Sequence, residues 1–297
     1  MSMKQVHIAA VIDISLDAGG STGCAGRKAA WEKGQTTTGQ SAGDTTAQIA
    51  EGDAHWAKRT DPNEIRAAIT AWEKAAKADP KNVDLLVKLT RANYFLADGF
   101  LRKDDKEYLK YMDVGVKWGE KAMQAASPEF DKKMRDGAKL PDAVKVIPKE
   151  GVPAMYWYAS ALGKWAKRKS FAVLLGQKDN VRAIMTRVLE LEPTYYHGGP
   201  YRYFGVFYAV APAFAGGDLK KAKESFEKSL ELAPTYVGTK VLWAEELAVK
   251  EQDEATFDKL LNEVLAAPDD VIPELKPEVI VEKQKARELL ADKDDRF

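Results

Sequence analysis

The sequence contains few of the residues that build metal and redox sites. Its 297 residues include one cysteine, Cys24, and three histidines, His7, His55 and His197, which lie far apart in the chain. A single cysteine cannot form an intrachain disulfide or a cysteine-based zinc or iron–sulfur site. No HExxH-type spacing is present either. We therefore expect no metal site and no cofactor.

The chain also lacks long apolar runs and an excess of one charge. No stretch of about 18 apolar residues occurs, which argues against an integral membrane protein built of spanning helices. The 45 Lys and Arg residues equal the 45 Asp and Glu residues in number. Because a dedicated nucleic-acid-binding protein shows a basic excess, we expect no nucleic-acid partner. Apolar residues make up 45% of the chain, enough for a real core, which excludes disorder of the whole chain.

The charges are unevenly distributed along the balanced chain. Seven basic residues and one acidic residue, Asp179, lie between Lys164 and Arg187. The segment 245–297 instead holds sixteen acidic and eight basic residues. Both segments fit solvated helix faces, and both also fit docking surfaces for a charged partner or lipid headgroups.

The first 52 residues have the composition of a signal and tether. Lys4, an apolar run and small residues precede Cys24, an order that resembles a bacterial lipoprotein signal, although Asp13 and Asp17 interrupt the apolar run. Cys24 is therefore our candidate for lipidation, and an expression tag or a misassigned start is the alternative. Residues 34–52 are rich in Gly, Thr, Gln and Ser, which is typical of a flexible linker. We expect a signal and tether at 1–52 and one helical domain at 53–297.

The body of the chain has helical periodicity interrupted by Gly and Pro, which predicts an all-α fold. Five amphipathic segments, among them EKAAKADP, RVLELEP and EKSLELAP, end at or next to a proline: Pro80, Pro128, Pro193, Pro234 and Pro268. Proline lacks the N–H that helix continuation needs. Helices are expected near 44–58, 63–78, 83–101, 104–125, 151–175, 178–191, 199–213, 218–232, 236–250, 253–266 and 278–291.

A shared stripe precedes three of these prolines. Small, large and small or medium residues stand twelve, eight and five positions before Pro234, Pro193 and Pro80. Such a stripe lets a neighbouring helix approach and fills the gap between the helices. It is typical of the second helix of a tetratricopeptide-like hairpin. The proline spacing is uneven, so we expect irregular hairpins forming a bundle or solenoid. The insertion 127–153 predicts a loop with a short helix over one face.

Aromatic residues concentrate in a few of the expected helices. On 199–213, Tyr201, Phe204 and Tyr208 share one face, whereas Tyr203 and Phe207 share another. A helix that is aromatic on two faces is either wholly buried or lines a cavity with one face. A bulky core and a cavity for an apolar body with one polar end are both consistent with this pattern. The candidate lining residues are Tyr94, Trp118, Tyr156, Trp157, Tyr201, Phe204, Phe207 and Tyr208.

The motif GGPYRYFG at 198–205 adds a charged candidate. Gly198 and Gly199 permit a tight turn, and Pro200 suits a first helical position. Arg202 then lies in the first turn, where a cation opposes the helix dipole. It needs another partner, such as a carboxylate or a tyrosine face. Arg202 is therefore either part of a structural ion pair or a polar anchor at the mouth of a cavity.

The C-terminal half resembles a known family. The run GGPYRYFG, Pro212, the GGD at 216–218, KAKESFEKSLELAPTY at 221–236 and the KARELLADKDDRF ending are similar to the T component associated with TRAP transporters. The resemblance covers 150–297 well and 60–126 loosely. It implies a periplasmic lipoprotein of helix hairpins that is attached to the outer membrane, works with a solute-binding protein and can form homo-oligomers. Related proteins act in bacterial sterol transport.

Two functions and one exclusion follow. The resemblance and the aromatic helices predict a carrier for a bulky apolar ligand such as a sterol or other lipid, working with a transporter. The alternative is a protein-interaction scaffold with no ligand of its own, since tetratricopeptide-like arrays present grooves to proteins. No group of residues suggests a positioned acid, base or nucleophile, so we expect no catalytic residues and no enzymatic activity.

Overall fold

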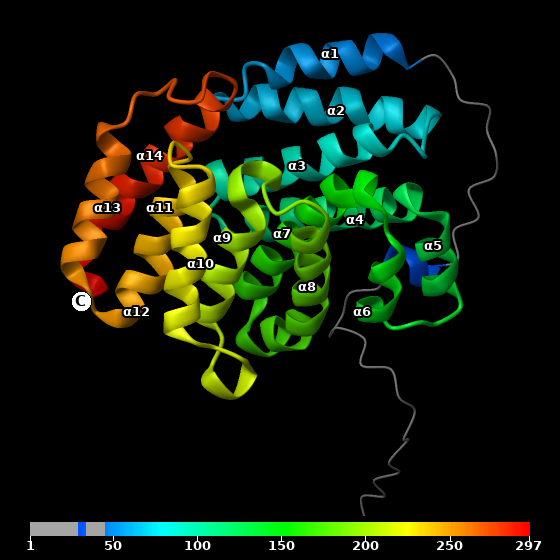
Figure 1. Ribbon diagram of the computed structural model, residues 1–297. Coiled ribbons are helices and arrows are strands. Elements are labelled where there is room, and N and C mark those ends of the chain that lie inside the picture. The colour runs from blue at the N-terminus through cyan, green and yellow to red at the C-terminus, as the bar shows by residue number, and fades with distance from the viewer. Residues whose placement is uncertain (1–28, 34–44) are drawn as a thin grey trace, which may run out of the picture.

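The computed structural model describes residues 29–33 and 45–297, and this part of the chain contains helices and no strand (Figure 1). The predicted all-α fold class is confirmed. The longer helices are α1 (Thr46–Trp56), α2 (Pro62–Ala78), α3 (Val83–Phe100), α4 (Asp105–Ala126), α5 (Pro128–Arg135), α7 (Val152–Lys169), α8 (Phe171–Leu191), α9 (Tyr195–Val210), α10 (Leu219–Leu232), α13 (Glu254–Ala266) and α14 (Lys276–Ala291).

Proline ends the helices as predicted. α2, α4, α8, α10 and α13 each end two residues before one of the five prolines named above. The residues of the predicted stripe are buried in all three helices that carry it: Ala68, Trp72, Ala75, Val181, Met185, Val188, Ala222, Phe226 and Ser229. The stripe is therefore the packing face of these hairpin helices.

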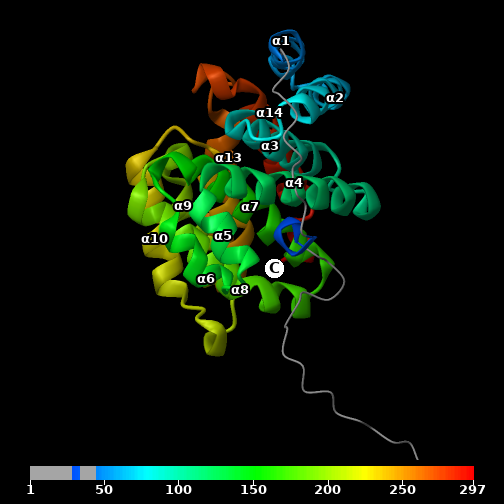
Figure 2. The same ribbon diagram turned by 90° about the vertical axis from the view of Figure 1, so that its right-hand side faces the viewer.

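Consecutive helices pack as hairpins that are arranged in layers. α1 packs on α2, α3 on α4, α7 on α8 and α9 on α10. Figures 1 and 2 show α1 to α4 stacked at one end of the molecule, with α7 to α10 forming the centre. The C-terminal α14 packs back on α3. The C-terminal helix of the array therefore lies against its N-terminal part.

The predicted break between the helices near 175 is wrong. α7 ends at Lys169, and only the extended Ser170 separates it from α8. The hydroxyl of Ser170 accepts a hydrogen bond from the backbone N–H of Val173 at 3.2 Å, which is the usual role of a helix N-cap. Gly176 lies inside α8, because an isolated glycine weakens a helix without ending it.

Two other regions differ in detail from the sequence prediction. The insertion 127–153 forms α5, the short α6 (Leu140–Ala143) and two 3-10 turns, Val144–Val146 and Lys149–Gly151. The helix expected at 236–250 is a rod of α11 (Gly238–Leu242), a π-helical segment (Trp243–Ala248) and α12 (Val249–Glu251). π-helical segments are rare and frequently occur at functional sites.

The predicted tether at 1–52 is only partly described. Cys24, the candidate lipidation residue, lies outside the described residues. The short 3-10 helix Ala30–Lys33 belongs to the core, since the ring of Trp31 packs edge-on against Phe130 and Tyr158. Within the predicted segment 1–52 this turn is therefore packed, because a lone tryptophan in a polar segment still gains by burial. α1 also begins at Thr46, before the predicted domain boundary at 53.

Candidate functional site

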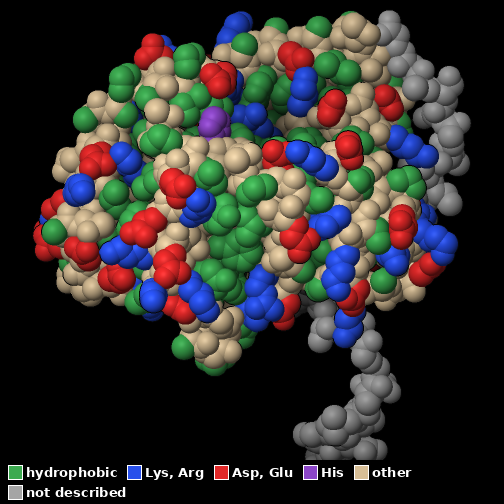
Figure 3. All heavy atoms as spheres, viewed as in Figure 1, with side chains coloured by type: hydrophobic (Ala, Val, Ile, Leu, Met, Phe, Trp, Pro, Cys, Tyr) green, Lys and Arg blue, Asp and Glu red, His purple; other side chains and the backbone are tan. Residues whose placement is uncertain are grey.

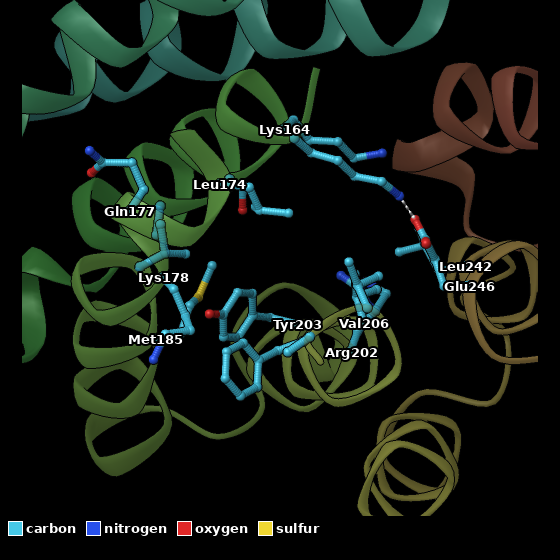
Figure 4. Close-up of a pocket in the computed structure, with 18 of the residues that line it drawn as sticks. Lys164, Leu174, Gln177, Lys178, Met185, Arg202, Tyr203, Val206, Leu242 and Glu246 are labelled. Carbon is cyan, nitrogen blue, oxygen red and sulfur yellow. Dashed lines mark hydrogen bonds and ion pairs between the residues drawn. The ribbon is translucent and has the colours of Figure 1, made fainter. Parts of the chain in front are cut away.

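An apolar cavity of about 180 Å³ lies between α7, α8, α9 and the rod that begins with α11. Figure 4 shows Leu174 and Met185 of α8 on one side and Leu242 on the other, with Val206 of α9 between them. In Figure 3, hydrophobic side chains gather in a hollow near the centre of the face over these helices. The walls are predominantly apolar, so this cavity suits an apolar body.

A left-handed turn positions α9 along the cavity. Tyr196, His197 and Gly198 have φ values of 43°, 59° and 69°, so the regular part of the helix starts only after them. A Cβ on Gly199 would lie 2.6 Å from the ring of Tyr156. The glycine pair therefore performs two tasks: Gly198 adopts the turn easily, and Gly199 leaves space for Tyr156 of α7.

Arg202 is buried beneath this turn, with 5% of its surface exposed. Its guanidinium donates hydrogen bonds to the carbonyl oxygens of Tyr196 and His197, both at 3.0 Å. It also donates to the hydroxyl oxygen of Tyr156 at 3.1 Å. Its plane lies over the ring of Tyr236, 4.3 Å from the ring centre. No carboxylate of the described residues forms an ion pair with Arg202, so the expected structural ion pair is absent from this part of the chain.

A second, polar cavity of about 100 Å³ adjoins the first. The two cavities share part of their lining: Tyr94, Tyr156, Ser160, Lys164, Arg202 and Leu242. Arg202 and Tyr156 therefore lie where the apolar cavity meets the polar one.

Asp98 of α3 is the centre of one ion-pair cluster in the polar cavity. Its carboxylate oxygens lie 3.0 Å from Nζ of Lys164 and 2.6 Å from Nζ of Lys285, which also pairs with Glu282 at 2.9 Å. Burial alone would raise the pKa of Asp98, but the two ammonium groups outweigh burial and hold this pKa well below its usual range. The cluster stays ionised at neutral pH and joins α3, α7 and α14.

Glu278 of α14 is the centre of a second cluster. Both of its carboxylate oxygens accept from Arg59, at 2.8 and 3.0 Å, and Arg91 of α3 donates at 2.8 Å. The ring of Tyr196 lies 5.2 Å from the guanidinium of Arg91. Burial raises the pKa of the Tyr196 hydroxyl to about 12 against the opposing charge of Arg91. Burial also raises the pKa of the Tyr236 hydroxyl, so Tyr196 and Tyr236 are neutral neighbours of Arg202 at physiological pH.

The predicted lining residues fall into two groups. Tyr94, Tyr156, Arg202 and Phe207 line the apolar cavity, and Trp157 lines only the polar one. The other four contribute to neither cavity: Trp118, Tyr201, Phe204 and Tyr208. The face of α9 that carries Tyr203 and Phe207 is the one that lines the cavity, whereas the buried Phe204 packs against Tyr208 with ring centres 5.9 Å apart.

Several lining residues were missed by the sequence analysis. Lys164, Lys167 and Lys178 line the apolar cavity, as do Gln177, Leu174, Met185, Tyr203 and Val206. The basic excess at 164–187 was the available signal for the three lysines. It was read as a surface feature, because the sequence does not show which face of a helix will meet a cavity.

The described residues contain no group of three or more His, Cys, Asp or Glu that could hold a metal ion. Among the same residues, no helix is both long enough and apolar enough to span a membrane.

Comparison with known proteins identifies the family. The model of the TRAP transporter T-component matches residues 67–297, well over half of the chain. The chain belongs to the TRAP transporter T-component family. A T-component is an accessory component of a transporter and is not known as an enzyme. Membership therefore places this chain in a family of accessory components of TRAP transporters.

A relative of this T-component is an uncharacterized protein of Treponema pallidum (strain Nichols), which is 24% identical over 218 residues. The match covers 70% of the chain and 66% of the relative's own length. The chain thus spans slightly less than two thirds of this relative. Both cavities lie within the region that the family model matches.

Proposed function

We propose that this T-component is a carrier for a bulky apolar ligand, such as a sterol or other lipid, that works with a TRAP-type transporter and its solute-binding protein. The observation that carries the proposal is the apolar cavity walled by Leu174, Met185, Val206 and Phe207. Binding there would be driven by apolar area removed from water, at about 25 cal/mol per Å² before ordering costs. Attachment to the outer membrane through Cys24 and assembly into homo-oligomers belong to the same proposal.

Lipid capture by a cavity-filling variant tests the proposal. The purified full chain is incubated with a bacterial lipid extract, washed, extracted with organic solvent and analysed by mass spectrometry. Val206→Trp places a large ring in the cavity, whereas Tyr208→Trp adds bulk on the same helix outside the lining. The wild type and Tyr208→Trp should retain a stoichiometric lipid, and Val206→Trp should lose it. Equal retention by all three proteins would contradict a ligand site in this cavity.

The second candidate is a docking scaffold without a ligand of its own, and two exposed phenylalanines favour it. Phe214 is 82% exposed and Phe171 is 58% exposed. Phe171 also lines the cavity, together with Ala215 beside Phe214. Exposed aromatic side chains of this kind often mark protein contacts. If no lipid is retained while Phe214→Ser abolishes capture of the solute-binding protein, the scaffold replaces the carrier.

A further inference from the structure

The cations on the cavity wall are not all neutralised. Four basic side chains line the apolar cavity, Lys164, Lys167, Lys178 and Arg202, against one acidic side chain, Glu246. An apolar cavity that binds a purely apolar molecule has no need of cations in its wall. A cation that is paired with a carboxylate of the protein offers little net charge to a ligand, whereas an unpaired cation can attract an anionic group of the ligand.

The three lysines have carboxylate partners. Lys164 pairs with Asp98 at 3.0 Å, Lys178 pairs with Asp179 at 2.8 Å, and Lys167 pairs with Glu246 across the cavity mouth (the dashed line in Figure 4). Asp98 and Asp179 lie outside the lining of the apolar cavity. The charges of these lysines are thus met by the protein itself.

Arg202 differs from the three lysines. Its four recorded acceptors are neutral oxygens: the carbonyls of Tyr196 and His197, and the hydroxyls of Tyr156 and Thr239. A guanidinium stays charged at any physiological pH. A buried charge satisfied by hydrogen bonds but without an opposite charge is costly, and an anion beside it would remove much of that cost. Its place at the meeting point of the two cavities makes it reachable from the apolar one.

Tyr156 extends this positive site toward the cavity. Its hydroxyl oxygen accepts from Nη2 of Arg202, which leaves its own hydrogen free to donate. Among the described residues, no acceptor for that hydrogen is recorded. A ligand oxygen placed there would receive a hydrogen bond from Tyr156 and the field of Arg202 together, and hydrogen bonds to ionised acceptors are about twice as strong as neutral ones.

We propose that the ligand is an amphiphile with a long apolar chain and one carboxylate, whose carboxylate lies at Tyr156 and Arg202 and whose chain lies along Leu174, Met185 and Phe207. The proposal rests on the proposed carrier function and narrows it, since a neutral sterol would leave Arg202 without a counter-charge.

A headgroup series on the full chain tests the proposal. Hexadecanoate, hexadecanol and hexadecylamine share one apolar chain and differ only in the polar end. Their dissociation constants are measured at neutral pH by titration calorimetry with cyclodextrin as carrier. We expect hexadecanoate to bind at least about tenfold more tightly than hexadecanol, and hexadecylamine to bind most weakly. Equal affinities for the acid and the alcohol would overturn the headgroup assignment and leave the carrier function standing. If none of the three binds while the chain still retains a lipid from the bacterial extract, the headgroup assignment fails and the carrier function stands. If the extract also yields no retained lipid, the carrier function fails.

Tyr156→Phe removes only the hydroxyl and keeps the ring beside Gly199. It should weaken hexadecanoate about fivefold to tenfold and leave hexadecanol unchanged. Tyr208→Phe removes a hydroxyl from a residue outside the lining and should change neither affinity. Arg202→Lys keeps the charge and should retain part of the preference for the acid, whereas Arg202→Gln should lose it. If Arg202→Gln fails to fold, Tyr156→Phe and the headgroup series still test where the carboxylate binds. An unchanged preference of Tyr156→Phe for hexadecanoate over hexadecanol would contradict the carboxylate position at Tyr156 and Arg202.

Discussion

In the polar cavity the carboxylates of Asp98 and Glu278 each meet two basic side chains, whereas in the adjoining apolar cavity the guanidinium of Arg202 meets no carboxylate of the described residues. All three groups are buried. The Asp98 and Glu278 clusters are therefore paired within the protein, and their ion pairs hold α14 against α3 and α7. Arg202, which lies where the two cavities meet, has no such pairing among the described residues. The two clusters thus stabilise the fold, whereas the surroundings of Arg202 are where we propose that the carboxylate of a ligand binds.

The largest expected effect on stability comes from breaking the Asp98 ion-pair cluster of the polar cavity. Asp98→Asn leaves Lys164 and Lys285 buried without their shared counter-charge, and losing one partner of a buried pair costs about 3–5 kcal/mol. The urea midpoint of unfolding should fall accordingly, with an unchanged slope. Asp136→Asn removes a carboxylate from an exposed pair with Lys132 and should keep the wild-type midpoint. Similar midpoints for the two variants would show that the Asp98 cluster does not stabilise the fold.

The same variant carries a pH signature. Because the folded-state pKa of Asp98 is depressed, its stabilising contribution is present above the unfolded-state pKa of about 3.9 and is lost as the pH falls below it. The wild type should therefore lose stability between about pH 5 and pH 2 more steeply than Asp98→Asn does. Parallel curves for the two proteins would contradict the depressed pKa.

A smaller effect is expected at Arg202 without ligand. Arg202→Met removes hydrogen bonds to neutral oxygens but also removes an uncompensated charge, so the free energy of unfolding should fall by only about 1–3 kcal/mol. Urea unfolding of Arg202→Met and Asp98→Asn compares the two losses of unfolding free energy directly. A loss as large as that of Asp98→Asn would mean that Arg202 has a counter-charge within the protein, and the contrast between the two cavities would collapse.

The smallest expected effect on stability tests the close contact between α9 and α7 at Gly199. Gly199→Ala places a Cβ against the ring of Tyr156 and forces that ring to move, which should destabilise the protein by about 1–2 kcal/mol. Gly176→Ala is the matched control, because nothing lies within 4 Å of its added Cβ in α8, and it should be neutral or slightly stabilising. Equal unfolding temperatures for both variants would show that the close contact at Gly199 is unimportant.

The fold was predictable from local signals, whereas the site was not. Proline and the buried stripe fix the ends and packing faces of α2, α8 and α10, since both depend on residues within one helix. The α7–α8 boundary was missed because a single residue, Ser170, separates the two helices. The turn at Gly198 was visible in GGPYRYFG, as was the need of Arg202 for a partner.

The partners themselves lie far away in sequence. Asp98 is brought to Lys164 and Lys285 only by the packing of three helices. Tyr156 of α7 contacts Arg202 of α9, a residue of a different helix hairpin. Tyr203 and the lysines of 164–187 line the cavity because of how α8 and α9 are rotated. The sequence pattern of one helix shows neither which distant residues it will contact nor how the helix is rotated about its axis. For this reason only some of the predicted lining residues line the cavity.

A crystal structure of the full chain with ω-bromo hexadecanoate would test the central claim most directly, because the bromine marks the end of the apolar chain. We expect the carboxylate within hydrogen-bonding distance of Arg202 and the Tyr156 hydroxyl, with the bromine near Leu174 and Phe207. A carboxylate at the solvent-exposed mouth with the bromine beside Arg202, or a ligand bound outside this cavity, would contradict it.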